Sequence, residues 1–189
     1  MAREQVKRKA GAQAAAIGAG ALVRDGRIVT DDPWRVLEDD AAIPAQGDIV
    51  MRPQRLEEAR ARNAGRLGVL IAPPDAVEDV AAHLPRLSLV MAAFPSFRDG
   101  RAYTTARLLR ERYGYQGEVR AVGDVLEDQL FSMLRCGFDS FDLRSKDPEA
   151  AFARAAKRFA HVYQPAADAR LPAWRRRLLR FAAAPEDAS

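Results

Sequence analysis

The sequence predicts an α/β protein with an open, mainly parallel sheet of repeated strand–helix units and an N-terminal β-hairpin. Between Gly68 and Leu143, short apolar runs alternate with helical patterns. Strands that alternate with helices through short links pair in parallel and cross over with a right hand. Nearer the N-terminus, Asp25-Gly26 separates two short apolar runs. This pair is a strong hairpin signal, because glycine accepts the positive φ of the turn.

The composition is that of an ordinary globular protein. The 189 residues are 48% hydrophobic and 30% charged, which fits one folded domain with extensions. The chain has no run of about 18 apolar residues, so no transmembrane helix is predicted, and we interpret the Ala- and Gly-rich start as a tail and not as a signal peptide. The single cysteine, Cys136, excludes an internal disulfide and a cysteine-held metal cluster. We therefore expect a cytoplasmic protein.

The first elements are the hairpin and a polar connector. The hairpin is predicted over residues 22–29, and Asp31-Asp32-Pro33-Trp34 ends it. The connector leads to a short strand at 48–51. Pro53 then opens a helix that runs to about Asn63, since its missing N–H costs nothing in a first helical turn.

Four strand–helix units follow. Their strands are the apolar runs, continuous as expected for strands covered on both faces, at 67–72, 87–93, 118–122 and 140–143. Asp75, Asp99 and Asp124 stand where they can cap the helices after the first three strands, and Pro148 opens the helix after the fourth.

These units can be arranged in two ways. One is an open sheet with helices on both faces, and the other is part of a (β/α) barrel. A closed eight-stranded barrel needs about 200 residues or more, so four units are too few to close one. We favour the open sheet, with the hairpin added at an edge or folded over one end.

Charge divides the chain into three parts. Residues 1–20 are predicted to be a disordered basic tail, residues 21–165 a single α/β domain, and residues 166–189 a basic C-terminal helix and tail. Nine of the 30 basic residues but only four of the 26 acidic residues lie outside 21–165, which leaves 21 basic and 22 acidic residues in the domain. A nucleic-acid-binding face on the domain is therefore not supported.

The basic helix expected at 171–181 is a separate feature. It carries Trp174 followed by Arg175-Arg176-Arg177. Such a helix can dock a partner or an acidic surface, and a solvated tail is equally compatible with the pattern.

Ligands of open parallel sheets bind beyond the carboxyl ends of the strands. Three guanidinium groups fall in or beside the loops at those ends, near helix N-termini, where they suit a small oxyanion such as sulfate or phosphate, or a carboxylate. The alternative is that the local aspartates are plain caps and that the arginines pair with nearby acids. The candidate anion-binding or ligand-binding residues are Ser96, Arg98, Asp99, Arg101, Gly123, Asp124 and Arg144.

Few other residues indicate a catalytic, metal-binding or cofactor-binding role. Asp124 can act as a general base, but Glu127 three residues later favours a capping role. Cys136 is expected to be a packed small side chain, because a helix C-terminus does not lower a thiol pKa. His83 and His161 lie far apart and have no second ligand at metal spacing, so no metal site is predicted. No Walker loop occurs and no GxGxxG follows a strand, so no cofactor is evident.

Three short sequence segments resemble those of a known family. They are Phe97-Arg98-Asp99-Gly100-Arg101, the run GDVLEDQL from Gly123 to Leu130, and Arg135-Cys136-Gly137-Phe138. Through these three segments the chain resembles the bacterial domain-of-unknown-function family nine-three-four. A looser resemblance extends over residues 25–163. The resemblance implies an association with assimilatory sulfite reduction, and members of that family are commonly described as oxidoreductases on that basis.

Two functions follow from the resemblance and the loops together. In the first, the protein is an accessory or regulatory protein of assimilatory sulfate and sulfite reduction that binds sulfite reductase, its electron donor or the oxyanion. In the second, it is a small enzyme, an oxidoreductase that acts on an anionic metabolite at the carboxyl edge of the sheet. Nucleic-acid binding through the basic tails is a third interpretation, and it predicts a steep salt dependence.

Overall fold

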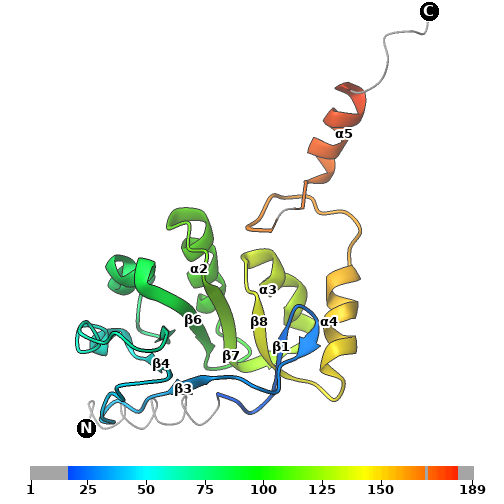
Figure 1. Cartoon of the computed structure of the whole chain (residues 1–189). Coiled ribbons are helices and arrows are strands. Elements are labelled where there is room, and N and C mark those ends of the chain that lie inside the picture. The colour runs from blue at the N-terminus through cyan, green and yellow to red at the C-terminus, as the bar shows by residue number, and fades with distance from the viewer. Residues whose placement is uncertain (1–16, 169, 183–189) are drawn as a thin grey trace, which may run out of the picture.

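The computed structural model describes residues 17–168 and 170–182 (Figure 1). Its central feature is one eight-stranded sheet. Its strands are β1 (Ala21–Arg24), β2 (Arg27–Ile28), β3 (Trp34–Val36), β4 (Asp48–Met51), β5 (Leu67–Ile71), β6 (Leu87–Phe94), β7 (Glu118–Leu126) and β8 (Ser140–Arg144).

The strand order is β2-β1-β8-β7-β6-β5-β4-β3. From β3 to β8, each strand pairs in parallel with the next strand in the chain. The hairpin strand β1 pairs antiparallel with β8 and with β2, so the hairpin extends one edge of the sheet. The prediction of an open, mainly parallel sheet with an added N-terminal hairpin is confirmed.

The helical segments are connectors between strands and a C-terminal extension. The α-helices are α2 (Arg101–Arg107), α3 (Leu130–Cys136), α4 (Pro148–Lys157) and α5 (Ala173–Ala182). The other helical segments are the 3₁₀ helices η1 (Pro53–Arg55), η2 (Val77–Arg86) and η4 (Glu127–Gln129), together with a π-helical turn, η3 (Leu108–Arg112), that continues α2.

The hairpin turn has the geometry that the sequence predicts. Asp25 and Gly26 have φ angles of 52° and 78°. Two consecutive residues with positive φ match the type I′ turn, whose twist suits the flanking strands. Arg24 pairs with Arg27, so the turn contains only the two predicted residues.

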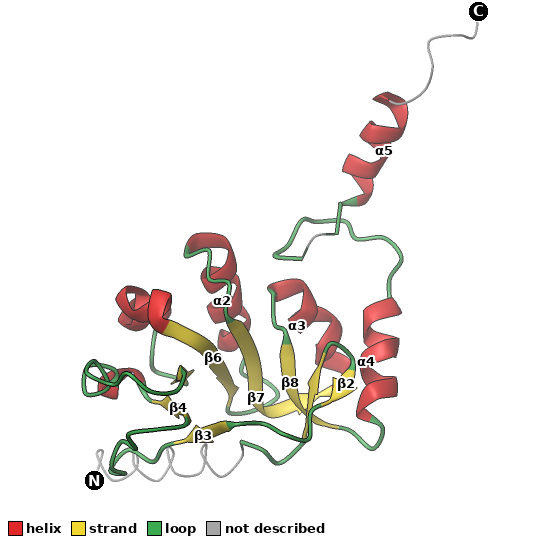
Figure 2. Ribbon diagram, viewed as in Figure 1, coloured by secondary structure: helices red, strands yellow, loops and turns green. Residues whose placement is uncertain are grey.

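The helices α2, α3 and α4 lie on one face of the sheet, which curls into half a barrel (Figure 2). This corrects the expectation of helices on both faces. Each connection leads to the adjacent strand in the same direction and with the same hand, so every helix falls on the same side. The main core lies between these helices and the sheet, and it includes Phe94, Leu109, Met133 and Phe141, each 0% exposed.

The opposite, inner face of the sheet divides into two halves. Across β4, β5 and β6 it is apolar, with buried side chains such as Leu70, Leu89 and Met91. Among the described residues, Ile17, Trp34 and Val36 pack against this half. Across β7 and β8 it carries the buried polar residues Arg120, Ser140 and Asp142. The segment before the hairpin is joined to this polar half, because the N–H groups of Gly18 and Gly20 donate to the Asp142 carboxylate at 2.5 and 2.7 Å.

Two predicted elements differ in the structure. Trp34, which is predicted to end the hairpin, instead begins the strand β3 (residues 34–36) beside β4. The helix predicted from Pro53 to about Asn63 is only the short η1 followed by turns, although Pro53 does stand in its first turn. Residues 1–16 of the predicted tail and residues 183–189 lie outside the described part of the chain.

None of the described helices is both long enough and apolar enough to cross a membrane. The predicted C-terminal helix is present as α5 (Ala173–Ala182), after the loop that follows α4.

Candidate functional site

The carboxyl ends of β6, β7 and β8 are joined by one side chain, Asp124. Its Oδ2 atom accepts a hydrogen bond of 2.8 Å from the N–H of Phe97, in the loop after β6. Its Oδ1 atom lies 3.4 Å from the guanidinium of Arg144, at the end of β8. The structure therefore brings together three of the four loops that follow the predicted parallel strands.

The prediction that Asp124 caps a helix is wrong. Strand β7 continues past the predicted end at residue 122 to Leu126, with a register shift opposite β8 between Ala121 and Val125. The helix begins later, and the Gln129 side chain accepts the hydrogen bond from the N–H of Leu126 at 3.0 Å. Asp124 is left free to bind a neighbouring loop, because a bulge re-aims side chains at the end of a strand.

Gly123 is required by the packing of two strands. It has a φ of 98°, and it pairs with Phe94 on β6. A Cβ atom at this position would lie 2.5 Å from the Phe94 carbonyl oxygen. The group that approaches the Gly123 backbone closely is therefore a carbonyl oxygen of the adjacent strand β6.

Asp99 and Arg101 form a local pair at the start of α2. The Arg101 Nε atom donates to Asp99 Oδ1 at 2.9 Å, and the Arg101 N–H donates to the same oxygen at 3.2 Å. The hydrogen bond from the Arg101 side chain lowers the pKa of the Asp99 carboxyl below its usual range. The N-cap residue of α2 is Gly100, one residue later than predicted, and Asp99 still accepts the N–H of Arg101, the first residue of the helix.

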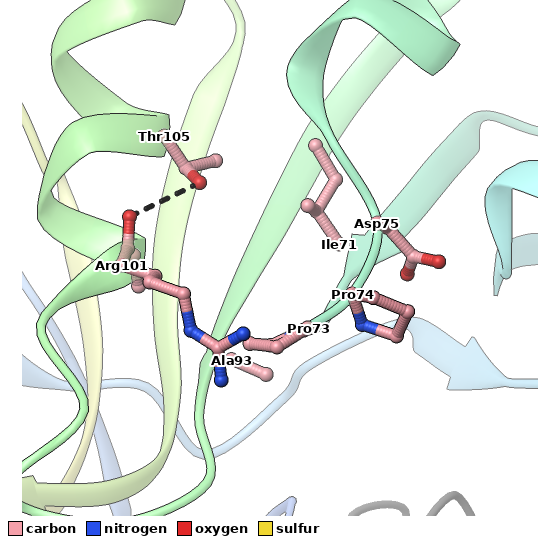
Figure 3. Close-up of a pocket in the computed structure, with 8 residues that line it drawn as sticks. Ile71, Pro73, Pro74, Asp75, Ala93, Arg101 and Thr105 are labelled. Carbon is pink, nitrogen blue, oxygen red and sulfur yellow. Dashed lines mark hydrogen bonds between the residues drawn. The ribbon is translucent and has the colours of Figure 1, made fainter. Parts of the chain in front are cut away.

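A small open pocket lies beside this pair, between the carboxyl ends of β5 and β6 and the start of α2 (Figure 3). The Arg101 guanidinium lies across it, beside Ala93 and Pro73, while Asp75 points away. Asp75 is bound elsewhere: its carboxylate lies 2.8 Å from the Arg52 guanidinium and 2.9 Å from Gln54 Nε2. Asp75 therefore fastens this loop to the segment after β4 and does not cap η2, whose N-cap is Ala76.

Ser96 and Arg98 lie exposed in the loop after β6. The Ser96 hydroxyl accepts a long hydrogen bond of 3.3 Å from the Arg98 N–H. Within residues 17–168 and 170–182, the Arg98 guanidinium has no hydrogen bond or ion pair. Two of the three candidate arginines are therefore paired with local acids, as the alternative interpretation expects, and Arg98 is not.

A second polar cluster, which the sequence interpretation missed, lies on the inner face of the sheet. The buried Arg120 guanidinium lies 2.6 Å from Asp32 and 2.9 Å from Glu118. Glu118 also binds Arg24 and the Ser140 hydroxyl. Charged residues at alternating positions, 118 and 120, of an otherwise apolar strand were the available signal, because such residues share one face.

The pKa shifts in this cluster show how tightly it is coupled. Burial alone would raise the pKa of Glu118, but hydrogen bonds from Arg24, Ser140 and Arg120 outweigh burial and lower it. Burial alone would lower the pKa of Arg120, and its contacts with Asp32 and Glu118 raise it instead. Both groups are therefore held in their charged forms, as a structural ion-pair cluster on the inner face.

The remaining candidates for chemistry are structural. Burial raises the pKa of the Cys136 thiol, so Cys136 is not an activated nucleophile. His83 lies 3.3 Å from Glu57, and His161 lies 3.0 Å from Arg176. Among the described residues, no group of three or more His, Cys, Asp or Glu side chains is placed to hold a metal ion.

The fold and this edge define an α/β half-barrel protein with arginine-bearing loops at the carboxyl ends of its strands. The chain belongs to the family described as bacterial protein of unknown function (DUF934), whose model matches residues 68–174. The matched region contains β6 to β8, all of β5 except its first residue, and every candidate site residue, and it confirms the resemblance predicted from the sequence. No curated protein matches the sequence significantly.

Proposed function

We propose that this protein is an accessory protein of assimilatory sulfite reduction that binds a small oxyanion at the carboxyl edge of β6, β7 and β8. The family resemblance supports the place in metabolism. The observation that supports the ligand is the link through Asp124, which holds the loop bearing the unpaired Arg98 against the end of β8, where Arg144 lies. This role places the protein in the cytoplasm.

The charges at this edge suit an oxyanion. Arg98, Arg101 and Arg144 supply three positive charges against the two carboxylates of Asp99 and Asp124. The contact of 3.4 Å between Arg144 and Asp124 is longer than the 2.7–2.9 Å typical of a charge-assisted hydrogen bond. Arg144 therefore keeps most of its hydrogen-bonding capacity for a sulfite or sulfate oxygen.

A small enzyme acting on an anionic metabolite is the second candidate, with Asp124 as its general base. A general base must reach the proton that it abstracts with a free oxygen. One Asp124 oxygen is held by the Phe97 N–H at 2.8 Å, and the other faces the Arg144 guanidinium at 3.4 Å. This arrangement favours a positioning role for Asp124 and hence the accessory function. Sulfite reductase or its electron donor is the partner that this function requires.

Isothermal titration calorimetry with sulfite and sulfate tests the ligand. We expect binding by the full chain, and a fall in affinity of about 10- to 150-fold for Arg98→Ala and for Arg144→Ala, because each removes one charge-assisted contact of about 1.5–3 kcal/mol. Arg112→Ala is the matched control, because Arg112 is exposed at the end of the π-helical turn η3 that continues α2, outside the candidate loops. Unchanged binding in both site variants would exclude the oxyanion site.

A deletion strain tests the place in metabolism. We expect it to grow on sulfide but to grow poorly on sulfate and on sulfite as sole sulfur source. Complementation with the Arg98→Ala/Arg144→Ala double variant then reports whether the oxyanion site is needed for that growth. Normal growth of the deletion strain on sulfite would contradict the proposed function.

A further inference from the structure

Exposed apolar side chains are concentrated at one end of the molecule. Of the eight large apolar side chains that are exposed among the described residues, six lie between residues 159 and 179. Tyr163 is 81% exposed and Leu178 is 60% exposed. We define the docking surface as these six residues: Phe159, Tyr163, Leu171, Trp174, Leu178 and Leu179. Single exposed apolar residues are common, whereas a concentration of them in one part of a molecule marks an interaction site.

The docking surface lies beyond the C-terminal end of α4 and along α5, which projects away from the sheet (Figure 1). The N-terminal end of α4 follows Arg144 after a short loop. The 10 residues of α4 therefore place about 15 Å between the docking surface and the carboxyl edge. The two sites can be occupied at the same time.

Part of the docking surface is a groove whose sides are joined by hydrogen bonds to backbone carbonyl groups. The Arg170 guanidinium donates to the carbonyl oxygens of Ala156 and Phe159 at 2.6 and 3.2 Å. The N–H of Ala173 donates to the Val162 carbonyl at 2.7 Å, which fastens the start of α5 to the loop after α4. The groove is lined by Ala156, Lys157, Phe159, Ala160, Val162, Arg170, Leu171 and Arg176.

The helix α5 extends this apolar surface outward. Trp174 and Leu178 are four residues apart, so they share one side of the helix, and both are more than half exposed. Trp is the residue type most often found as an energetic anchor in protein interfaces. A helix that presents such a stripe is of the kind that binds in an apolar groove of a partner.

The charge around the docking surface is strongly basic. Between residues 150 and 182 the chain has eight basic residues and one acid, Asp168. That acid is paired with Arg135 at 3.3 Å. The basic residues include Arg158, Arg175 and Arg176, which lie exposed next to the apolar side chains. A partner that covers this surface must therefore bring negative charge.

We propose that the docking surface binds an acidic protein, which places an apolar side chain in the groove and carboxylates against the surrounding arginines. A second copy of this chain fits poorly, because two such surfaces would oppose like charges. A protein can also place single side chains in this shallow, open groove, which the plane of a lipid surface does not do. The proposal concerns a different end of the molecule from the oxyanion site and does not depend on it.

Site-specific photo-crosslinking of the full chain in its bacterial host tests this proposal. The crosslinking residue p-benzoylphenylalanine replaces Leu178, and in a control protein it replaces Arg112, which is exposed outside the docking surface. We expect one protein to be crosslinked from position 178 and not from position 112. That protein is then identified by mass spectrometry, purified and mixed with the unmodified chain.

Direct binding of the two purified proteins decides the outcome. We expect a net negative partner whose affinity falls by about tenfold or more for Trp174→Ala/Leu178→Ala and at high salt, but not for Ile28→Ala, which truncates an exposed apolar residue elsewhere. A second copy as the crosslinked product, equal crosslinking from both positions, a partner without net negative charge, or binding only to vesicles of anionic phospholipid would each overturn the proposal. Circular dichroism of the double variant checks that it is folded.

Discussion

The Asp124 carboxylate accepts a hydrogen bond of 2.8 Å from the backbone N–H of Phe97, which lies after the neighbouring parallel strand. The same carboxylate contacts Arg144 at 3.4 Å. One side chain thus positions the loop after β6 and partly neutralises the arginine at the end of β8. Its substitution separates the two candidate functions, because a positioning group and a general base respond differently to the loss of charge.

We expect Asp124→Asn to raise the affinity for sulfite by about fivefold. The amide oxygen still accepts a hydrogen bond from Phe97, while Arg144 no longer faces a carboxylate, a change of about 1 kcal/mol for two charges near 4 Å in a solvated site. Calorimetry of the two proteins at equal ionic strength measures the difference. Loss of sulfite binding would contradict the expected gain in affinity, and loss of a turnover that the wild-type protein shows with an anionic metabolite would support Asp124 as a general base.

Replacing Gly123 should destabilise the fold. We expect Gly123→Ala to lower the free energy of unfolding by about 2–4 kcal/mol, because the residue has positive φ and the new Cβ would lie 2.5 Å from the Phe94 carbonyl oxygen. The matched control is Gly114→Ala, which has a φ of 60° but no atom within 4 Å of the added Cβ, and should cost about 1 kcal/mol. Urea unfolding measures the free energy of unfolding of both variants. Equal losses of stability would contradict the idea that the close approach of β6 to Gly123 makes its substitution costly.

The regular part of the fold could be predicted because its signals are local. Four strands are continuous apolar runs between helical patterns, and the Asp25-Gly26 turn needs only two residues to specify it. The strand β3 was missed because three residues that include Arg35 carry no clear period. The placement of α2, α3 and α4 on one face follows from strand order, which no local pattern in the sequence specifies.

The roles of the aspartates at the strand ends depend on distant partners. An aspartate after a strand can cap the next helix or bind a neighbouring segment, and the sequence pattern is the same in both cases. Asp75 binds Arg52 and Asp124 binds the loop at Phe97, so tertiary contacts override the capping pattern. The inner-face cluster also depends on a distant partner, since Arg120 binds Asp32, which lies 88 residues away in the chain.

The guanidinium of Arg110 connects the starts of β7 and β8. Its Nε atom donates to the Gly137 carbonyl at 3.0 Å, one Nη donates to the Gly117 carbonyl at 2.9 Å, and the other binds Asp139. We expect Arg110→Lys to lower the free energy of unfolding by about 2 kcal/mol, because one ammonium cannot make three divergent contacts. Arg107→Lys, in an exposed i,i+4 pair with Glu111, is the control and should change it by less than about 0.5 kcal/mol. Urea unfolding distinguishes the two, and equal effects would show that Arg110 contributes only a surface charge.

The inner-face cluster predicts a pH-dependent difference between the wild-type protein and Glu118→Gln. The pKa of Glu118 is lowered in the folded protein from its ordinary value of 4.5, so its charge stabilises the fold fully above about that pH and less as the pH falls through the folded pKa. Near neutral pH the substitution should cost about 2 kcal/mol, because Arg120 keeps Asp32 but loses its second partner.

Urea unfolding of both proteins between about pH 7 and about pH 3 measures this difference. We expect the gap in the free energy of unfolding to shrink as the pH falls below about 4.5, because the wild-type carboxylate becomes protonated while glutamine does not titrate. Other carboxyl groups with lowered pKa, such as Asp48 and Asp99, are present in both proteins and cancel in the comparison. A gap that stays constant over the whole pH range would mean that the charge of Glu118 contributes nothing to the stability of the cluster.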